Sequence, residues 1–152
     1  MYKRILVPLD GSTTARRGLR EAIGLAQVHG ARLLLLHVVD DYPLLIEASA
    51  SAAAFDQVRD AMRRQGENLL AEALATAQAA GVEAEKLLRE VTAYRVAQAI
   101  VEESRQAACD LIVMGTHGRR GIGRLMLGSD AETVLKSSPV PVLLVRDAEA
   151  SS

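Results

Sequence analysis

The sequence predicts an α/β fold in which a parallel sheet is covered by helices on both faces. Four short apolar runs have the length of strands and occupy residues 3–9, 32–39, 111–114 and 140–145, and a fifth, more polar run occupies residues 82–91. Between them lie segments whose apolar residues recur at helical spacing. Strands that alternate with helices pair in parallel and are joined by right-handed crossovers. We therefore expect one sheet of five strands, connected by four helices, without internal repeats.

The length and composition fit one domain with a sizeable core. The chain has 152 residues, of which 49% are hydrophobic. We assign residues 1–147 to this domain and residues 148–152 to a polar tail. The formal net charge of −1 argues against a general binder of nucleic acid or anionic membranes, because both need an excess of positive charge. Aromatic residues make up only 3%, so base stacking on an aromatic surface is not expected.

Three features of the sequence indicate a cytoplasmic protein. Its single cysteine excludes an internal disulfide and fits a reducing compartment. The apolar run near the N-terminus is too short for a signal peptide. No stretch approaches the roughly 18 apolar residues of a membrane span. We therefore expect no membrane segment.

The first half of the chain begins with a strand, a helix and a second strand. Lys3–Leu9 predicts the first strand, and Ser12 or Thr13 caps a helix that ends at Gly30. Arg32–Val39 is almost continuously apolar, which is typical of a strand covered on both faces. The helix between these strands has apolar residues at helical spacing: Ala15, Leu19, Ala22, Ile23 and Ala26.

The middle of the chain is less regular. Residues 40–54 are biased to Ala and Ser, without strand alternation or a clear helix cap, and predict a long loop. A helix over residues 55–80 follows and ends at Gly81. Residues 82–91 predict a more polar strand at an edge of the sheet, and Thr92 caps a helix that runs to about Ala108. The long helix is expected to bury one face, made of Val58, Met62, Leu69, Ala73 and Ala77.

The stretch from Asp110 to Ser137 has the order that proteins use to hold phosphate groups. A buried strand, Leu111–Met114, leads into a loop rich in Gly and Arg, and a helix begins at Gly128-Ser129. Glycine lets backbone N–H groups approach a ligand, and a helix N-terminus offers unpaired donors and partial positive charge. The spacing matches neither a Walker A nor a GxGxxG motif. The stretch therefore indicates a phosphate site of another design.

Two strand ends carry unusual residues, Asp10 after the first strand and Gly115 after the fourth. In a parallel α/β sheet, ligands bind beyond the carboxyl ends of the strands, where the chain order reverses. If these two strands are neighbours, both residues face one crevice.

Each candidate residue also has an explanation in which it binds no ligand. Gly115 and Gly118 can be turn residues, Asp10 can cap the turn before the first helix, and Ser129 can form a capping box with Glu132. Capping and phosphate contact are compatible for Ser129, because both place the hydroxyl at the same helix start. Three loop arginines are interpreted as solvated charges or, alternatively, as phosphate ligands: Arg119, Arg120 and Arg124.

The remaining chemically active side chains have structural interpretations. His37 lies in an apolar strand and is read as a core or strand-end histidine. His117 lies in the loop without a second His, Cys or carboxylate at metal-ligand spacing. Cys109 precedes a buried strand and is interpreted as a small apolar residue.

Three segments resemble the universal stress protein family: KRILVPLDGS at residues 3–12, LLLLHVVD at 33–40, and the stretch from Asp110 to Val145. The most specific element is the spacing G-x2-G-x9-G-S, which Gly115, Gly118, Gly128 and Ser129 meet. That spacing is the pattern of the family's ATP-binding branch. The resemblance covers essentially the full chain.

The resemblance implies strand order 3-2-1-4-5 and a homodimer joined through Val140–Val145. It also implies ATP between the first and fourth strands, with Mg²⁺ or Mn²⁺ carried by the phosphates. Gly118 would let the backbone approach the phosphates, beside Arg119. The adenine, ribose and nucleoside side would be lined by Pro8, Leu9, Asp10, Val38, Met114 and Gly115. The phosphates would lie against Gly128, Ser129, Asp130 and Ala131.

Asp130 departs from the family pattern, which has a small apolar residue after Gly-Ser. A carboxylate in the first helical turn would repel a triphosphate bound there. We expect an ATP-binding regulatory module in the stress response, with an unknown client protein and little or no turnover. The alternatives are a slow ATPase or nucleotidyl-transfer enzyme, and a dimeric interaction protein that binds no nucleotide. The enzyme is disfavoured because no general-base constellation or lysine accompanies the loop.

Overall fold

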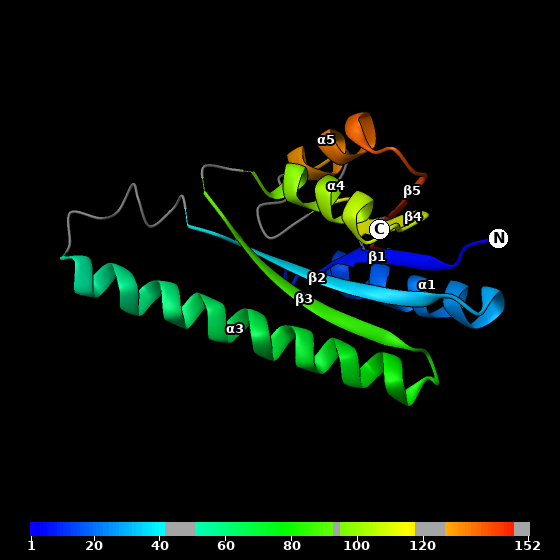
Figure 1. Ribbon diagram of the computed structural model, residues 1–152, viewed down its shortest axis with the longest axis horizontal. Helices are drawn as coiled ribbons and strands as arrows, with labels where there is room; N and C mark the ends of the chain where they lie inside the picture. The colour runs from blue at the N-terminus through cyan, green and yellow to red at the C-terminus, as the bar shows by residue number, and fades with distance from the viewer. Residues whose placement is uncertain (42–50, 93–94, 118–126, 148–152) are drawn as a thin grey trace.

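The computed structural model describes residues 1–41, 51–92, 95–117 and 127–147. Strands and helices alternate along the chain, as the sequence predicts (Figure 1). The elements are β1 (Arg4–Pro8), α1 (Thr13–His29), β2 (Arg32–Asp40), α3 (Ala52–Ala79), β3 (Ala84–Val91), α4 (Val96–Gln106), β4 (Leu111–Gly115), α5 (Ser129–Ser137) and β5 (Val142–Val145).

The sheet is parallel and has five strands in the order β3-β2-β1-β4-β5, which confirms the predicted fold class and strand order. Ile5 of β1 pairs with Leu33 of β2 on one side and with Leu111 of β4 on the other. The chain order therefore reverses between β1 and β4, and the carboxyl ends of these two strands lie side by side. A parallel α/β sheet binds its ligands at such a point.

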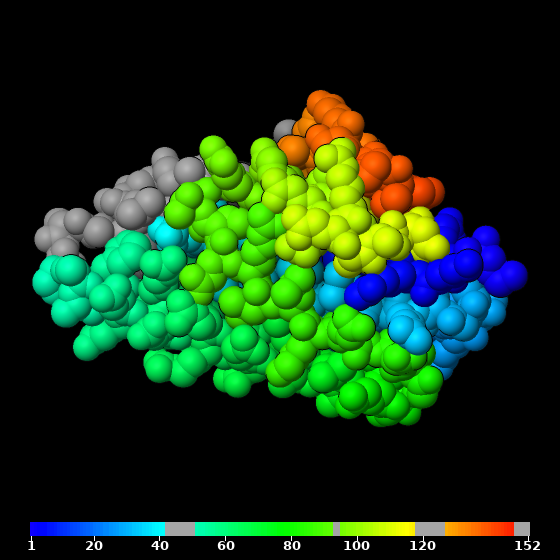
Figure 2. Space-filling view, viewed as in Figure 1, coloured from blue at the N-terminus to red at the C-terminus, as the bar shows by residue number. Residues whose placement is uncertain are grey.

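Helices cover both faces of the sheet, with α1 and α3 on one face and α4 and α5 on the other (Figure 1). Successive strand residues point to opposite faces, so Ile5 and Leu35 belong to the core under α1 and α3, whereas Leu6 and Leu34 belong to the core under α4 and α5. The space-filling view shows α3 along one long edge of the molecule (Figure 2). Among the described residues, no helix is both long and apolar enough to cross a membrane.

The first helix follows the predicted capping. The Ser12 hydroxyl accepts a hydrogen bond from the Ala15 N–H at 3.2 Å, and the chain leaves α1 at Gly30 in the left-handed conformation, with φ of 66°. Only a residue that tolerates positive φ ends a helix this way at low cost. The predicted apolar positions of this helix are all buried.

The third helix begins earlier than predicted and buries only part of the predicted face, in which Ala73 and Ala77 are buried as expected. Ser51 caps it by accepting from the Ala54 N–H at 3.3 Å, so α3 starts at Ala52 and not at residue 55. Leu70 is completely buried, whereas Val58, predicted to be buried, is 45% exposed. All four buried residues lie from the middle of the helix onward: Gly66, Leu70, Ala73 and Ala77.

The fourth helix also differs from the prediction at its start. It begins at Val96, and its N-cap is Arg95, which makes no side-chain capping bond. Thr92 is therefore too far from the first turn to cap it, and this prediction is wrong. The segment from residue 40 to 54, predicted as a long loop, includes residues 42–50, which lie outside the described residues.

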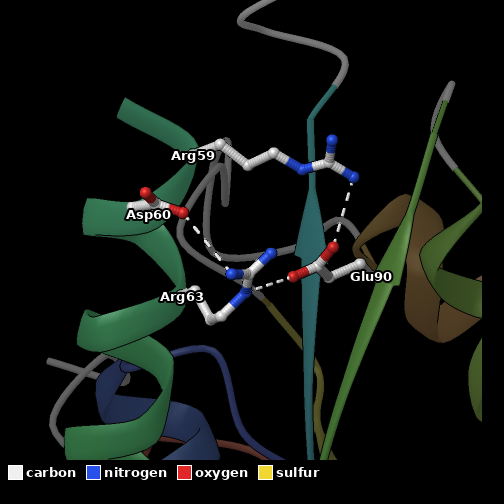
Figure 3. A network of polar contacts seen from close by, with 4 residues as sticks. All are labelled: Arg59, Asp60, Arg63 and Glu90. Atoms are coloured by element: carbon white, nitrogen blue, oxygen red, sulfur yellow. Dashed lines mark hydrogen bonds and ion pairs between the residues drawn. The ribbon is translucent and has the colours of Figure 1, made fainter. Parts of the chain in front are cut away.

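A network of charged side chains joins the N-terminal half of α3 to the end of β3 (Figure 3). The Glu90 carboxylate accepts from Arg63 Nε at 2.5 Å and from Arg59 Nη2 at 3.2 Å. Arg63 also contacts Asp60 at 3.4 Å. The hydrogen bond from Arg63, together with its charge and that of Arg59, holds the pKa of Glu90 below the ordinary 4.5. Because this half of α3 buries no residue, these contacts help hold it against β3.

Glu90→Gln is expected to lower the free energy of unfolding by about 1 kcal/mol at neutral pH. The folded-state pKa of Glu90 is lowered, so its contribution is complete above the unfolded value near 4.5 and is lost as the pH falls through the folded value. Urea unfolding at pH 7 and pH 3 should show the variant and the parent converging in acid. Glu67→Gln is the control. The Glu67 carboxylate lies 3.9 Å from Lys86 Nζ, at the limit of an ion pair, so removing its charge should change the stability little. An equal difference at both pH values would contradict the prediction.

Candidate functional site

A cavity of about 770 Å³ lies at the carboxyl ends of β1, β2 and β4, between these strands and helices α4 and α5. The strands and helices that meet there are far apart in the sequence (Figure 1). The structure brings ten of the twelve predicted site residues to its walls: Pro8, Leu9, Asp10, Val38, Met114, Gly115, Gly128, Ser129, Asp130 and Ala131. Gly118 and Arg119 lie outside the described residues, as do Arg120 and Arg124.

The first wall of the cavity is the chain leaving β1. The Leu9 N–H donates to the Leu36 carbonyl at 2.8 Å, which extends the β1–β2 ladder by one residue. The chain then turns at Gly11, whose φ is 86°. Asp10 closes this turn by accepting from the Ser12 N–H at 2.9 Å. Asp10 therefore lines the cavity and also has the turn-capping role that the sequence allowed.

Gly115, at the end of β4, is required by packing. A Cβ at this position would lie 2.5 Å from Thr14 Oγ1 and 2.9 Å from the Thr14 carbonyl carbon. The φ angle of Gly115 is not positive, so its backbone conformation does not require glycine. Thr14 is buried, and its hydroxyl donates to the His117 carbonyl. The glycine thus lets the first turn of α1 approach β4 and hold the chain where it leaves that strand.

The second wall is the start of α5, where the described residues provide no side-chain capping bond. Gly128 is the N-cap residue, and Ser129 is the first residue of the helix. The predicted capping box between Ser129 and Glu132 is wrong, because Glu132 instead pairs with Lys136 at 2.8 Å. The pairing lowers the pKa of Glu132, chiefly through the Lys136 hydrogen bond. The start of a helix attracts anions through its unpaired N–H groups and its dipole.

One wall of the cavity was missed from the sequence. Val96, Ala97, Gln98 and Ile100 line it from the first turns of α4. These residues belong to an ordinary amphipathic helix, without glycine, charge clusters or a motif, so the sequence carried no signal for them. The wall is largely apolar, as is the opposite side formed by Leu36 and Val38. A flat apolar ring would fit between such walls.

The other reactive side chains have structural roles. Cys109 is buried among apolar residues, and burial raises the pKa of its thiol to about 11, so it stays protonated. His117 lines the cavity, with Nδ1 3.0 Å from the Thr116 hydroxyl. Within the described ranges, no group of three or more His, Cys, Asp or Glu side chains is placed to hold a metal ion.

Known proteins resemble this chain in sequence and in fold. The universal stress protein family model matches residues 1–146. A universal stress protein of Thermus aquaticus is 38% identical over 96% of this chain and all of its own length. The structure of MJ0577, a universal stress protein of Methanocaldococcus jannaschii, has a TM-score of 0.85 and 26% identity, covering 97% of each chain. A universal stress protein in complex with cAMP has a TM-score of 0.68 and 27% identity, covering 95% and 97%. The match over nearly the whole chain, the shared sheet and the motif at the cavity establish that this chain belongs to the universal stress protein family.

Proposed function

We propose that this protein binds ATP in the cavity and acts as a regulatory module of the stress response, with little or no turnover. The observation that carries the proposal is the meeting of Gly115, Gly128 and Ser129 around one cavity, at a helix start that has no side-chain capping bond within the described part of the chain. A relative of the same fold and 27% identity forms a complex with cAMP, which is also an adenine nucleotide. We infer a cytoplasmic location from the single, buried cysteine.

The cavity walls suggest how the nucleotide would lie. The adenine and ribose would contact the apolar side, between Pro8, Leu9, Asp10 and Val38, with Met114 and Gly115 against the nucleoside. The phosphates would lie at the start of α5, against Gly128, Ser129, Asp130 and Ala131, where the helix dipole favours negative charge. Mg²⁺ or Mn²⁺ would be held mainly by phosphate oxygens.

Calorimetry with ATP and Mg²⁺, with GTP as the matched competitor, tests this proposal. We expect ATP to bind more tightly than GTP and to raise the melting temperature. The absence of both heat and thermal shift at millimolar ATP would overturn it and favour the dimeric interaction protein that binds no nucleotide. Multiple-turnover release of phosphate would instead favour the alternative of a slow ATPase.

Asp130→Val should tighten ATP binding by roughly tenfold, about 1.4 kcal/mol. Asp130 is exposed, lines the cavity and lies in the first turn of α5. Two unit charges about 4 Å apart repel by about 1 kcal/mol in water and about 4 at an effective dielectric of 20. Solvent and a bridging cation keep the effect in the lower part of that range.

The charge alone is isolated by Asp130→Asn, which keeps the shape of the side chain. Both variants should bind ATP more tightly than the parent and lose about 0.3–1 kcal/mol of stability, because the carboxylate no longer interacts with the helix dipole. Unchanged or weaker binding in a titration would mean that Asp130 points away from the phosphates or helps hold the metal ion.

We also propose a homodimer through residues 140–145. The strand β5 is an edge of the sheet, and its Leu143 is 39% exposed. An apolar edge with unpaired backbone groups favours pairing with a second copy. Leu143→Asp should therefore give a folded monomer by light scattering. Val28→Asp is the control, since Val28 is 81% exposed on α1; a dimer that survives Leu143→Asp would place the interface elsewhere.

A further inference from the structure

His37 forms a hydrogen bond with the chain that lines the cavity, although it is not itself a lining residue. It lies in β2, and its Nδ1 is 2.7 Å from the carbonyl oxygen of Leu9. A carbonyl oxygen only accepts hydrogen bonds. Nδ1 must therefore carry the hydrogen and donate it, which fixes the tautomer of the neutral imidazole with Nε2 unprotonated.

The Leu9 carbonyl lies where β1 has left the regular sheet. Paired residues of β1 end at Pro8 with Leu36 on the β2 side and at Leu6 with Ile112 on the β4 side. Leu9 is only 5% exposed and lines the cavity. A buried carbonyl left without a donor is costly. The imidazole of His37 supplies that donor at the last residue before the chain turns away through Asp10 and Gly11.

The other side of the imidazole packs against the middle of α3. A Cβ on Gly66 would overlap His37 Cδ2 and lie 3.0 Å from Nε2 and 2.9 Å from Leu88 Cδ1. Gly66 is buried in α3, whereas every described residue of the cavity wall comes from elsewhere in the chain. The ring is thus confined between α3 on one side and the Leu9 carbonyl on the other.

We propose that His37 is a positioning residue of the nucleotide cavity. Its Nδ1–H holds the Leu9 carbonyl, and with it the wall formed by residues 8–10, while Gly66 of α3 sets the place of the ring. The inference rests on the proposed function, because it concerns the same cavity. It adds a connection between that cavity and α3, the helix that packs on the opposite face of the sheet from α4 and α5.

An isosteric pair of variants tests the role of the donor. His37→Asn places an amide nitrogen close to the position of Nδ1, whereas His37→Leu has the same shape and no donor. We expect the Asn variant to bind ATP within about threefold of the parent, and the Leu variant to bind at least about tenfold more weakly. Val82→Ala is the control for lost stability, because Val82 is buried at the opposite end of the strands; its affinity should equal that of the parent.

A second pair of variants tests the connection to α3. Gly66→Ala forces the imidazole or Leu88 to move, while Gly24→Ala in α1 meets no atom within 4 Å. We expect Gly66→Ala to weaken ATP binding severalfold although it lies outside the cavity, and Gly24→Ala to leave binding unchanged.

The outcomes separate this inference from the proposed function. No ATP binding by the parent protein would overturn the proposed function itself. Binding by the parent with equal affinities for the Asn and Leu variants would overturn only the role of His37. If the Leu variant does not fold, ¹⁵N spectra of the parent decide: an imidazole protonated at Nδ1 supports the role, and one protonated only at Nε2 overturns it.

Discussion

Gly115→Ala is expected to destabilise the protein by about 3 kcal/mol, which is the upper end of the usual cost of overpacking. The added Cβ would lie 2.5 Å from Thr14 Oγ1 and 2.8 Å from Thr14 Cβ. Thr14 is held in the first turn of α1 and donates to the His117 carbonyl, so it has no free rotamer to adopt without breaking that bond. Relief therefore requires α1 to move away from β4, which also widens the cavity at its centre. Urea unfolding would measure the loss of stability, and titration with ATP would show weaker binding.

Gly18→Ala is the matched control. Gly18 lies one turn further along α1 and faces the same strand end, but its Cβ would be 3.7 Å from the Gly115 nitrogen, an ordinary contact. Replacing glycine by alanine inside a helix stabilises by roughly 0.5–1 kcal/mol. The two substitutions should therefore have opposite signs. If both were neutral, the close approach of α1 and β4 at Gly115 would not be as tight as the structure shows.

The sheet was predictable chiefly because its inner strands are nearly pure apolar runs, whereas the edge strand β3 is more polar. Arg32–Asp40 is buried on both faces in its centre, and Leu111–Met114 is buried throughout. Such segments predict buried strands, and the helical segments between them indicate that the strands pair in parallel. The prediction that β1 and β4 are adjacent in the sheet came from the resemblance to a family. Apolar runs indicate that strands are buried, but they do not indicate which strands are adjacent in the sheet.

Helix starts were predicted less well, since a side chain that can cap a helix has competing partners. Glu132 had the spacing of a capping box with Ser129, but Lys136 is its partner one turn further on. Both pairings are local and similar in energy, so the sequence alone does not choose. At α4, the cap residue Arg95 makes no side-chain capping bond, so the start of this helix has no cap signal in the sequence.

The motif glycines show why a sequence pattern does not separate packing from binding. The spacing predicted Gly115 as a residue against the nucleoside, or else as a turn glycine. The structure places it on the cavity wall and also under Thr14, without a positive φ. Close approach of a helix to a strand end and close approach of a ligand both exclude a Cβ. The same residue type therefore satisfies either requirement, and here the packing requirement is visible.

The buried part of α3 was predicted too long, because its apolar stripe continues into the first half of the helix, where no residue is buried. Val58, Met62 and Leu69 share a helical stripe with Ala73 and Ala77, but the buried residues of α3 begin only at Gly66. There the contact is centred on Leu70, which is 0% exposed, and Leu69 is only partly buried. Two adjacent leucines therefore have different environments that the sequence does not distinguish.

Leu70→Ala is accordingly expected to cost about 3 kcal/mol, and Leu69→Ala about 1 kcal/mol. A fully buried leucine loses its transfer free energy and leaves a cavity, whereas a half-buried one loses part of the former and leaves an open surface. The cost at Leu70 should be high because α3 buries so few side chains, with Gly66, Ala73 and Ala77 as its only other buried residues in the described structure. Urea unfolding of both variants measures the difference, and hydrogen exchange along α3 would show whether the helix opens before the rest of the domain. Equal costs at the two positions would mean that Leu69 and Leu70 are buried to the same extent, contrary to the structure.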